Sequence, residues 1–237
     1  MNGTSTKTAG DKLEFPSGLT LSTLLAFAAG FVDTCGFIML FGLFTAHVTG
    51  NFVLIGDSLA ESRPGIYAKL LAFPAFMIVV AITRFYLLHC ERRQRDPTRS
   101  LLVAQVTFLA LFLATGVIAS PIRDADAPFV ILIGIFGVTA MAIQNVASRT
   151  VFAAYAPTTI MTGNVTQVVM DLVELPLRAD AAQAKARLHK MIPPVIGFAA
   201  GAIASGLAVA WVGFWALLCP LLVMALVCVT YYRSTSP

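Results

Sequence analysis

Long apolar runs, separated by short polar stretches, follow one another along almost the whole chain. Six of these runs are long enough for an α-helix to cross the hydrocarbon core of a membrane, which takes about 20 residues. They cover residues 22–44, 67–88, 101–119, 128–152, 192–212 and 214–232. The pattern therefore predicts an all-α membrane protein with six transmembrane helices.

Two further apolar segments are shorter, and both begin with the same three residues. Thr49-Gly50-Asn51 precedes the apolar residues 52–60, and Thr162-Gly163-Asn164 opens a segment that ends near residue 176. The sequence separation of the two motifs is 162 − 49 = 113, which is close to half of the chain length of 237 residues. Each half is therefore expected to hold three spans, with a short Thr-Gly-Asn half-helix after its first span.

The short segments decide how the two halves are oriented. Because a helix rises about 1.5 Å per residue, segments of this length cannot cross and are expected to be re-entrant or interfacial. Each half then crosses an odd number of times, and the second half is inverted relative to the first. We expect a flexible polar tail at residues 1–18, a first membrane repeat at 19–120 and an inverted second repeat at 121–237. If both short segments crossed, the chain would have eight spans instead.

Composition agrees with a membrane protein and leaves no room for a soluble catalytic domain. Apolar residues make up 58% of the chain and charged residues 12%, whereas a soluble domain carries about 25% charged residues. Mean hydropathy is +0.83. The formal net charge is +4, and most of the basic residues lie between the spans. Membrane orientation explains that placement better than nucleic-acid binding, so no nucleic-acid partner is expected.

The distribution of lysine and arginine predicts the orientation of the chain. With six spans, ten of these residues are assigned to the side of the N-terminus, and Arg63, Lys69, Arg123 and Arg233 are assigned to the other side. Basic residues concentrate on the cytoplasmic side of membrane proteins. The count predicts a cytoplasmic N-terminus and a C-terminus on the opposite side, and the eight-span arrangement gives the same ratio.

Four stretches form a combination that is more specific than any one of them alone. They are Gly30-Phe31-Val32-Asp33, residues 44–51, Gln144-Asn145 and the second Thr-Gly-Asn motif. Together they resemble the YoaK-like family of uncharacterised bacterial multi-spanning membrane proteins, over nearly the whole chain after the polar tail. The resemblance implies a compact multi-pass protein of the bacterial inner membrane, and it names no solute.

Asp33 lies near the middle of the first predicted span. A carboxylate at that depth costs about 2.5–3.5 kcal/mol on insertion scales, so it needs a partner, water or a ligand. Asn145 falls at or next to the matching place in the second half, since 145 − 33 = 112. Two interpretations remain open: Asp33 is a proton, cation or solute site, or it forms a structural ion pair with Arg84 or Arg149.

The Thr-Gly-Asn motifs have the chemistry of helix starts. Glycine permits a tight turn, and threonine or asparagine can cap a helix with its side-chain oxygen. The first turn of the following helix carries free N–H groups and the positive end of the helix dipole. If both starts converge inside the membrane, they form an electropositive spot suited to an anionic group. Otherwise they cap two lipid-facing helices.

Two other polar positions invite both a functional and a structural interpretation. His47, directly before the first motif, either titrates near neutral pH or caps the preceding helix. Asp171 shares one helical face with Asn164 and Gln167 in the second short segment. A solvated membrane-surface face would explain that stripe equally well.

Small residues recur four apart in the fifth predicted span, at Gly197, Gly201 and Ser205. Such a stripe lets helices approach closely, either within the molecule or between two copies, so a homodimer is one expectation. The histidines and cysteines show no metal-ligand spacing, and nucleotide-binding and hydrolase motifs are absent from the sequence. We expect no metal, no cofactor and no enzymatic activity.

The sequence favours a transporter or channel for a small polar or anionic solute, with proton coupling through Asp33. The residues expected along the solute or ion pathway are Asp33, Thr49, Gly50, Asn51, Gln144, Asn145, Thr162, Gly163 and Asn164. Arg84, Arg149 and Asp171 are expected as charge partners, and His47 as a pH-sensitive group. The expected partners are the lipid bilayer and a small solute. The alternative is a membrane sensor or assembly protein whose polar residues only hold helices together.

Overall fold

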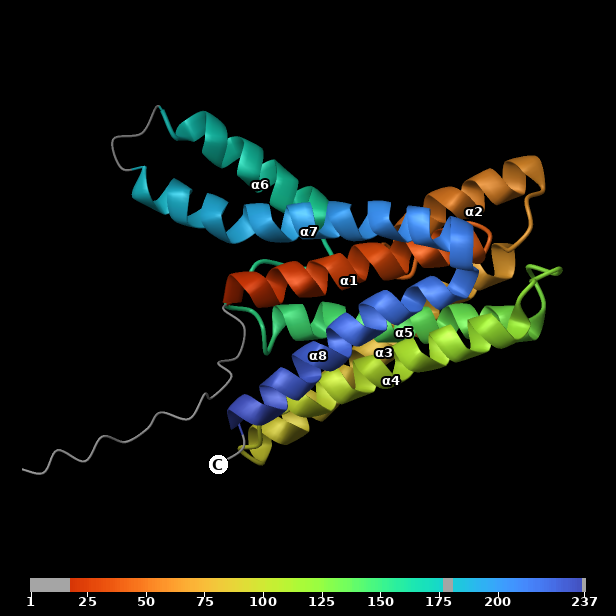
Figure 1. The fold of residues 1–237 in the computed structure, drawn as a ribbon, viewed down its shortest axis with the longest axis horizontal. Coiled ribbons are helices and arrows are strands. Elements are labelled where there is room, and N and C mark those ends of the chain that lie inside the picture. The colour runs from red at the N-terminus through yellow and green to blue at the C-terminus, as the bar shows by residue number, and fades with distance from the viewer. Residues whose placement is uncertain (1–17, 177–180, 236–237) are drawn as a thin grey trace, which may run out of the picture.

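The computed structural model describes residues 18–176 and 181–235, and within these ranges the chain is helical with no strand. The helices are α1 Gly18–Met39, α2 Gly50–Glu61, α3 Ile66–Arg92, α4 Thr98–Ala119, α5 Pro128–Arg149, α6 Met161–Glu174, α7 Ala182–Val212, the 3-10 helix η1 Gly213–Leu217 and α8 Leu218–Thr235 (Figure 1). The predicted all-α class is confirmed. The predicted tail at residues 1–18 lies outside the described residues except for Gly18.

Five stretches of the described chain are long and apolar enough to cross a membrane. Four of them correspond to α1, α3, α4 and α5. The fifth is the 52-residue stretch Ala182–Arg233, which contains α7, η1 and most of α8. Gly213 interrupts this last stretch with a φ of +56°, and Figure 1 shows α8 running back in the direction from which α7 came. With 12 and 14 residues, α2 and α6 are too short to cross.

The first helix ends earlier than the apolar pattern predicts. It stops at Met39 rather than near residue 44, and Phe41 and Gly42 adopt left-handed φ values of +53° and +88°. The chain then runs irregularly until α2 begins at Gly50. Hydropathy missed this boundary because the irregular segment is almost as apolar as the helix before it.

The most extensive helix packing joins α1 to α7. A Cβ atom on Gly201 would lie 2.1 Å from the carbonyl oxygen of Phe27, and one on Gly30 would lie 2.2 Å from the carbonyl oxygen of Phe198. Only glycine permits such an approach of two backbones. The small-residue stripe of α7 therefore packs within the molecule, and a homodimer remains a prediction that needs another surface.

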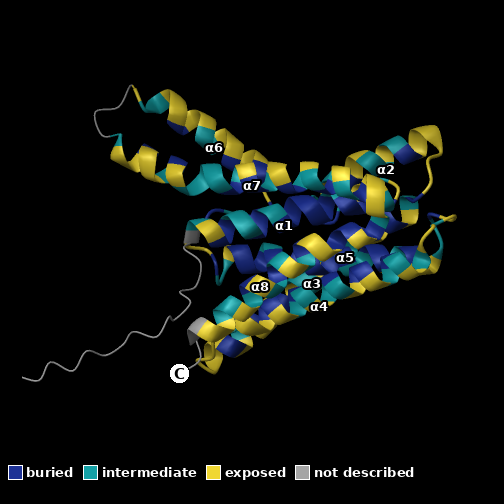
Figure 2. Ribbon diagram, viewed as in Figure 1, coloured by how far each residue is buried: buried dark blue, intermediate teal, exposed yellow. Residues whose placement is uncertain are grey.

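Each of the first four α-helices has a counterpart among the last four, and the counterparts make the same pattern of contacts. α1 packs on α7 as α5 packs on α3, α4 packs on α5 as α8 packs on α1, and α2 packs on α3 as α6 packs on α7. Corresponding helices run in opposite directions, since α1 runs from left to right in Figure 1 and α5 from right to left. α1 and α5 are also the most buried of the candidate spans (Figure 2).

The two short helices begin near the middle of the molecule and extend toward opposite ends (Figure 1). Each is preceded by an irregular segment that connects it to the end of a buried helix, α1 or α5. The fold therefore brings residues 40–49 and 150–160 toward the centre of the bundle, where they can form a shared site.

The end of α8 lies beside the loop between α3 and α4. The hydroxyl of Tyr231 donates a hydrogen bond to Asp96, and the guanidinium of Arg99 lies 4.3 Å from the ring centre of Tyr232. Arg233 therefore belongs to the same end of the molecule as Arg99. The assignment of Arg233 and the C-terminus to the side opposite Arg99 was wrong, because α8 ends beside Arg99.

Candidate functional site

The asparagines of the two repeated motifs hold the segments that precede α2 and α6. The Asn51 amide bonds both backbone groups of Phe44: its Nδ2 donates to the carbonyl oxygen at 2.9 Å, and its Oδ1 accepts from the N–H at 2.9 Å. The Asn164 Nδ2 donates to the carbonyl oxygen of Pro157 at 2.8 Å. Phe44 and Pro157 precede their asparagines by the same sequence separation, but Pro157 has no N–H to complete a second bond. Both amides are buried, and each bonds the backbone of the segment that precedes its own helix.

The other motif residues differ from the expected helix-start chemistry. Thr49 forms no side-chain cap on α2, and among the described residues positive φ glycines occur at Gly42, Gly65 and Gly213 rather than at Gly50 or Gly163. A Cβ on Gly50 would contact the ring of Phe44 at 3.0 Å, whereas one on Gly163 would meet nothing within 4 Å. The tight turns therefore lie before the motifs, which are already helical.

The starts of α2 and α6 are not equivalent in hydrogen bonding. The N–H groups of Gly50, Asn51 and Phe52 each bond the carbonyl oxygen three residues earlier, at 2.8, 3.2 and 3.2 Å. Within the described part of the chain, no acceptor receives the N–H groups of Thr162 and Gly163. Free N–H donors therefore remain at the start of α6 and not at the start of α2.

Asp33 is buried in α1, and its partner is His47 rather than an arginine. One carboxylate oxygen accepts the N–H groups of Thr45 and Ala46, both at 2.7 Å, and the other lies 2.7 Å from Nδ1 of His47. These charge-assisted bonds offset the cost of placing a carboxylate at this depth. The Asp33 side chain thereby holds the irregular segment before α2 against the second half of α1.

The two expected arginine partners of Asp33 lie elsewhere. Arg84 is exposed on α3, where its guanidinium bonds Glu91 at 2.9 Å. Arg149 is exposed at the end of α5. Neither arginine forms an ion pair with Asp33. The predicted carboxylate–arginine pair is therefore wrong, and the carboxylate pairs with the His47 imidazole instead.

The second half repeats the Asp33–His47 arrangement without charge. The Asn145 Nδ2 donates to the hydroxyl of Thr159 at 2.8 Å, and the two pairs have the same sequence separation. Of the two equivalent pairs, only Asp33–His47 contains ionisable side chains.

Gln144 ties three helices together through a fully bonded amide. Its Nε2 donates to the carbonyl oxygen of Leu25 at 2.8 Å and to the hydroxyl of Thr158 at 3.1 Å, and its Oε1 accepts from Gln105 at 2.6 Å. The side chain is buried. The structure therefore places Gln144 in the packing between α1, α4 and α5.

Asp171 fastens α6 to α7. Its buried carboxylate accepts hydrogen bonds from the guanidinium of Arg187, with Nη2 at 2.6 Å and Nε at 3.0 Å, and from Gln167 at 3.0 Å. The equivalent contact in the first half is weaker, since the Lys69 Nζ lies 3.4 Å from the hydroxyl of Ser58. The polar stripe of α6 thus faces α7 rather than solvent.

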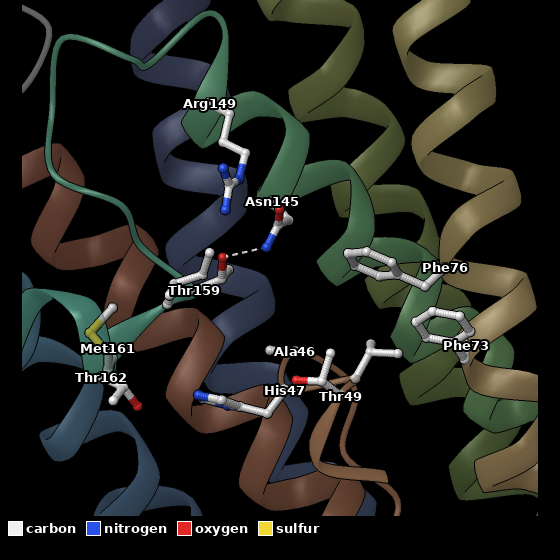
Figure 3. Close-up of a pocket in the computed structure, with 12 residues that line it drawn as sticks. Ala46, His47, Thr49, Phe73, Phe76, Asn145, Arg149, Thr159, Met161 and Thr162 are labelled. Atoms are coloured by element: carbon white, nitrogen blue, oxygen red, sulfur yellow. Dashed lines mark hydrogen bonds between the residues drawn. The ribbon is translucent and has the colours of Figure 1, made fainter. Parts of the chain in front are cut away.

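A cavity of about 350 Å³ lies where the two irregular segments meet. Its walls come from the residues that precede and begin α2 and α6, from one face of the end of α5, and from two aromatic rings of α3. They are Ala46, His47, Val48, Thr49, Phe73, Phe76, Asn145, Arg149, Thr159, Ile160, Met161 and Thr162 (Figure 3). The cavity is lined by residues from both halves of the chain.

The cavity is electropositive on the side of the second half. Among the described residues no carboxylate pairs with Arg149, and Figure 3 shows its guanidinium beside Asn145 and Thr159. The positive dipole end of α6 and its free N–H groups lie at the same wall. On the opposite side, the His47 ring stands in front of the buried Asp33 and packs edge-on against Phe198 at 5.4 Å.

The structure collects some predicted site residues at the cavity and excludes others. His47, Thr49, Asn145, Arg149 and Thr162 line it. Asp33 lies directly behind His47, and Gly50, Asn51, Gly163 and Asn164 support the lining loops. Gln144, Arg84 and Asp171 are engaged outside it. Within the described ranges, no group of three His, Cys, Asp or Glu side chains could hold a metal ion.

Sequence reasoning missed Thr159, Phe73 and Phe76. Thr159 had a signal, because its sequence separation from Asn145 equals that of His47 from Asp33. Phe73 and Phe76 had no such signal. They lie within an apolar span, and hydropathy does not show which face of that span points inward.

The chain has relatives that can be recognised from its sequence. A family described as "Protein of unknown function (DUF1275)" matches residues 21–230. The "UPF0700 transmembrane protein YoaK" of Bacillus subtilis (strain 168) is 28% identical over 154 residues, which cover 65% of this chain and 66% of that relative. The match thus spans slightly less than two thirds of the relative's length. No solved structure matches the chain.

Proposed function

The chain belongs to the DUF1275 family of membrane proteins, and we propose that it carries a small polar or anionic solute across the membrane through the cavity between α2 and α6. One observation carries the proposal. The two repeated motifs, far apart in the sequence, deliver their preceding loops to one cavity that also holds an arginine without a carboxylate partner among the described residues.

The proposed architecture is six spans in two inverted triplets, residues 19–120 and 121–237. The repeated helix contacts and the opposite directions of corresponding helices support it. In this arrangement α7 and α8 are the fifth and sixth spans, and α2 and α6 are re-entrant half-helices that start at mid-depth. Discontinuous helices of this kind form the solute sites of many transporters at the interface of their repeats.

The proposed solute carries a carboxylate or a similar anionic group. Arg149 supplies a fixed positive charge, and the free N–H groups at Thr162 and Gly163 supply donors at the positive end of α6. The hydroxyls of Thr49 and Thr162 line the same space. The rings of Phe73 and Phe76 form an apolar wall, which suits a solute with a short hydrocarbon part.

We further propose that the Asp33–His47 pair couples transport to protons. The His47 side chain is 36% exposed, while that of Asp33 is only 5% exposed, so the imidazole connects the carboxylate to the cavity. Protonation of the pair adds positive charge opposite Arg149 and favours an anion between them. The neutral Asn145–Thr159 pair cannot do this, so one proton site per molecule is expected.

The proposed location is the bacterial inner membrane with the N-terminus in the cytoplasm. Arg92, Arg93, Arg95 and Arg99 lie at the same end of the molecule as the start of α1. Moving Arg233 to that end increases the excess of basic residues there, which supports the orientation.

Uptake by reconstituted liposomes tests the proposal. Small monocarboxylates, dicarboxylates and neutral polar solutes are presented to the wild type, to Arg149→Gln and to Arg84→Gln. The control removes the same charge from an exposed arginine outside the cavity. We expect Arg149→Gln to reduce uptake of the transported anion by about tenfold or more, equivalent to one lost charge-assisted contact, and Arg84→Gln to leave it unchanged. Equal uptake by the two variants, or no uptake of any solute class by the wild type, contradicts the proposal.

The alternative function is a membrane sensor or assembly protein. It is favoured by the way Asn51, Asn164, Gln144 and Asp171 all hold loops or helices together. A sensor would bind the anion at Arg149 without moving it. Binding measured by calorimetry together with silent liposomes would select this alternative.

A further inference from the structure

A second cavity, unrelated to the one between the short helices, opens between α3 and α4. It has a volume of about 540 Å³ and is lined mainly by apolar side chains, among them Val79, Ile82, Phe108 and Ile143. In the described chain α3 and α4 both pack on α5 but not closely on each other. The result is a groove, with α5 as its floor, that runs along the outside of the bundle.

The groove faces the bilayer rather than the interior of the protein. Ile82, on its α3 wall, is 62% exposed, and neighbouring Phe85 is 73% exposed. A concave apolar surface of this kind, at the depth of the hydrocarbon core, is in contact with acyl chains.

Polar and basic groups gather at one end of the groove. Tyr86 and Ser100 line it there, next to the loop that joins α3 to α4. Arg92 at the end of α3 and Arg93 and Arg95 in that loop are exposed. Within the described residues none of them pairs with a carboxylate. Arg92 follows Tyr86 by six residues, or about 9 Å along the helix. This distance is enough to reach from the acyl-chain region of a bilayer to its headgroup region.

The two carboxylates nearest to these arginines in the sequence already have hydrogen-bond partners. Glu91 bonds Arg84 at 2.9 Å, and Asp96 accepts the N–H and hydroxyl of Thr98 at 3.0 and 2.6 Å. Asp96 keeps its negative charge, because its donors are neutral, but the three arginines outnumber it. The mouth of the apolar groove therefore carries net positive charge.

We propose that this groove is a binding site for an anionic phospholipid, with an acyl chain between α3 and α4 and the phosphate against Arg92, Arg93 and Arg95. Basic clusters at the cytoplasmic ends of transmembrane helices recognise anionic headgroups. The apolar lining supplies the other half of a lipid's chemistry, which a soluble anion lacks. The site is independent of solute transport.

Lipid retention by the full chain tests the proposal. The protein is purified in detergent, stripped of lipid and titrated with phosphatidylglycerol or with phosphatidylcholine of the same acyl chains. Native mass spectrometry counts the lipids retained, and thermal unfolding reports their stabilisation. We expect phosphatidylglycerol to be retained about fivefold or more over phosphatidylcholine, since one basic side chain near an anionic headgroup contributes about that factor.

Two pairs of variants separate the headgroup contact from the groove. Arg92→Gln/Arg93→Gln/Arg95→Gln should abolish the preference, whereas Arg123→Gln, in the loop at the opposite end, should keep it. Ala104→Leu fills the groove, which Ala104 lines, and should abolish retention. Ala114→Leu, exposed on the same helix and outside the groove, should not.

Three results would overturn the proposal. The first is equal retention of the two lipids, and the second is a triple variant that behaves like Arg123→Gln. The third is a dimer that Ala104→Leu dissociates without any dependence on lipid charge, which would mean that a second copy occupies the groove. An unfolding midpoint for each lipid-free variant near that of the wild type excludes misfolding as the cause.

Discussion

At the scale of single residues, most of the polar side chains inside this protein serve the backbone. Asn51 satisfies both groups of Phe44, Asn164 satisfies one group of Pro157, and Asp33 satisfies two N–H groups before α2. Irregular backbone within a membrane needs such partners because no water is present to replace them. The polar residues of the motif therefore supply hydrogen-bond partners for the irregular backbone between the helices.

The two asparagines give the first prediction. Asn51→Ala leaves two backbone groups of Phe44 without a partner, and Asn164→Ala leaves one carbonyl of Pro157. At about 1–3 kcal/mol for each unsatisfied buried group, Asn51→Ala is expected to lower the free energy of unfolding by about twice as much. Thermal or denaturant unfolding in detergent measures both. Equal losses would mean that water reaches the Phe44 N–H.

The Asp33–His47 pair gives the second prediction. Asp33→Asn keeps an acceptor oxygen for Thr45 and Ala46, so the variant is expected to fold, but it removes the carboxylate from the His47 imidazole. Wild-type uptake should rise as pH falls from about 7.5 to 5.5, because protonation of the pair adds positive charge to the cavity. In Asp33→Asn the rise in uptake should begin at lower pH, because the His47 imidazole no longer has a carboxylate that stabilises its protonated form. A variant that retains the wild-type pH profile would remove the pair from the coupling mechanism.

At the scale of helices, the positions of the glycines determine which pairs of helices can approach each other closely. Gly201 and Gly206 lie on the same helix and differ sharply in their surroundings. A Cβ on Gly201 would penetrate the backbone of α1 at Phe27, whereas one on Gly206 would meet nothing within 4 Å. The sequence shows two similar glycines, and only the packing of α7 on α1 distinguishes them.

These glycines give the third prediction. Gly201→Ala should destabilise the protein by about 1–3 kcal/mol or more, because α1 and α7 must move apart. Gly206→Ala should be neutral or stabilising by up to about 1 kcal/mol, since alanine favours the helix. Unfolding midpoints of the two variants against the wild type provide the measurement. Equal effects would indicate that α7 is not held against α1 through this face.

At the scale of the whole molecule, the two halves share a plan and differ in chemistry. The first half has the Asp33–His47 pair and a helix start whose N–H groups are bonded. The second half has the neutral Asn145–Thr159 pair and a helix start whose first N–H groups, within the described chain, have no acceptor. In the proposed mechanism the first half handles the proton and the second half the anion.

The topology gives the fourth prediction. The end of α8 lies against the α3–α4 loop, so a reporter fused after Pro237 should lie on the same side as that loop, in the cytoplasm. Green fluorescent protein at this position should be fluorescent and alkaline phosphatase inactive. A phosphatase inserted after Arg123 should be active. The reverse pattern would invert the proposed orientation, and matching signals at both positions would exclude six spans.

The sequence by itself determined which parts of this chain are long and apolar enough to cross a membrane and where its repeated motif lies. Apolar runs of spanning length and the regular spacing of the two motifs are properties of the chain alone, and hydropathy depends on local composition. Only the tertiary structure decided the partner of Asp33, the target of Asn51 and the aromatic wall of the cavity. Those contacts join residues separated by irregular segments whose path follows from packing, and hydropathy cannot distinguish an inward-facing phenylalanine from one that faces lipid.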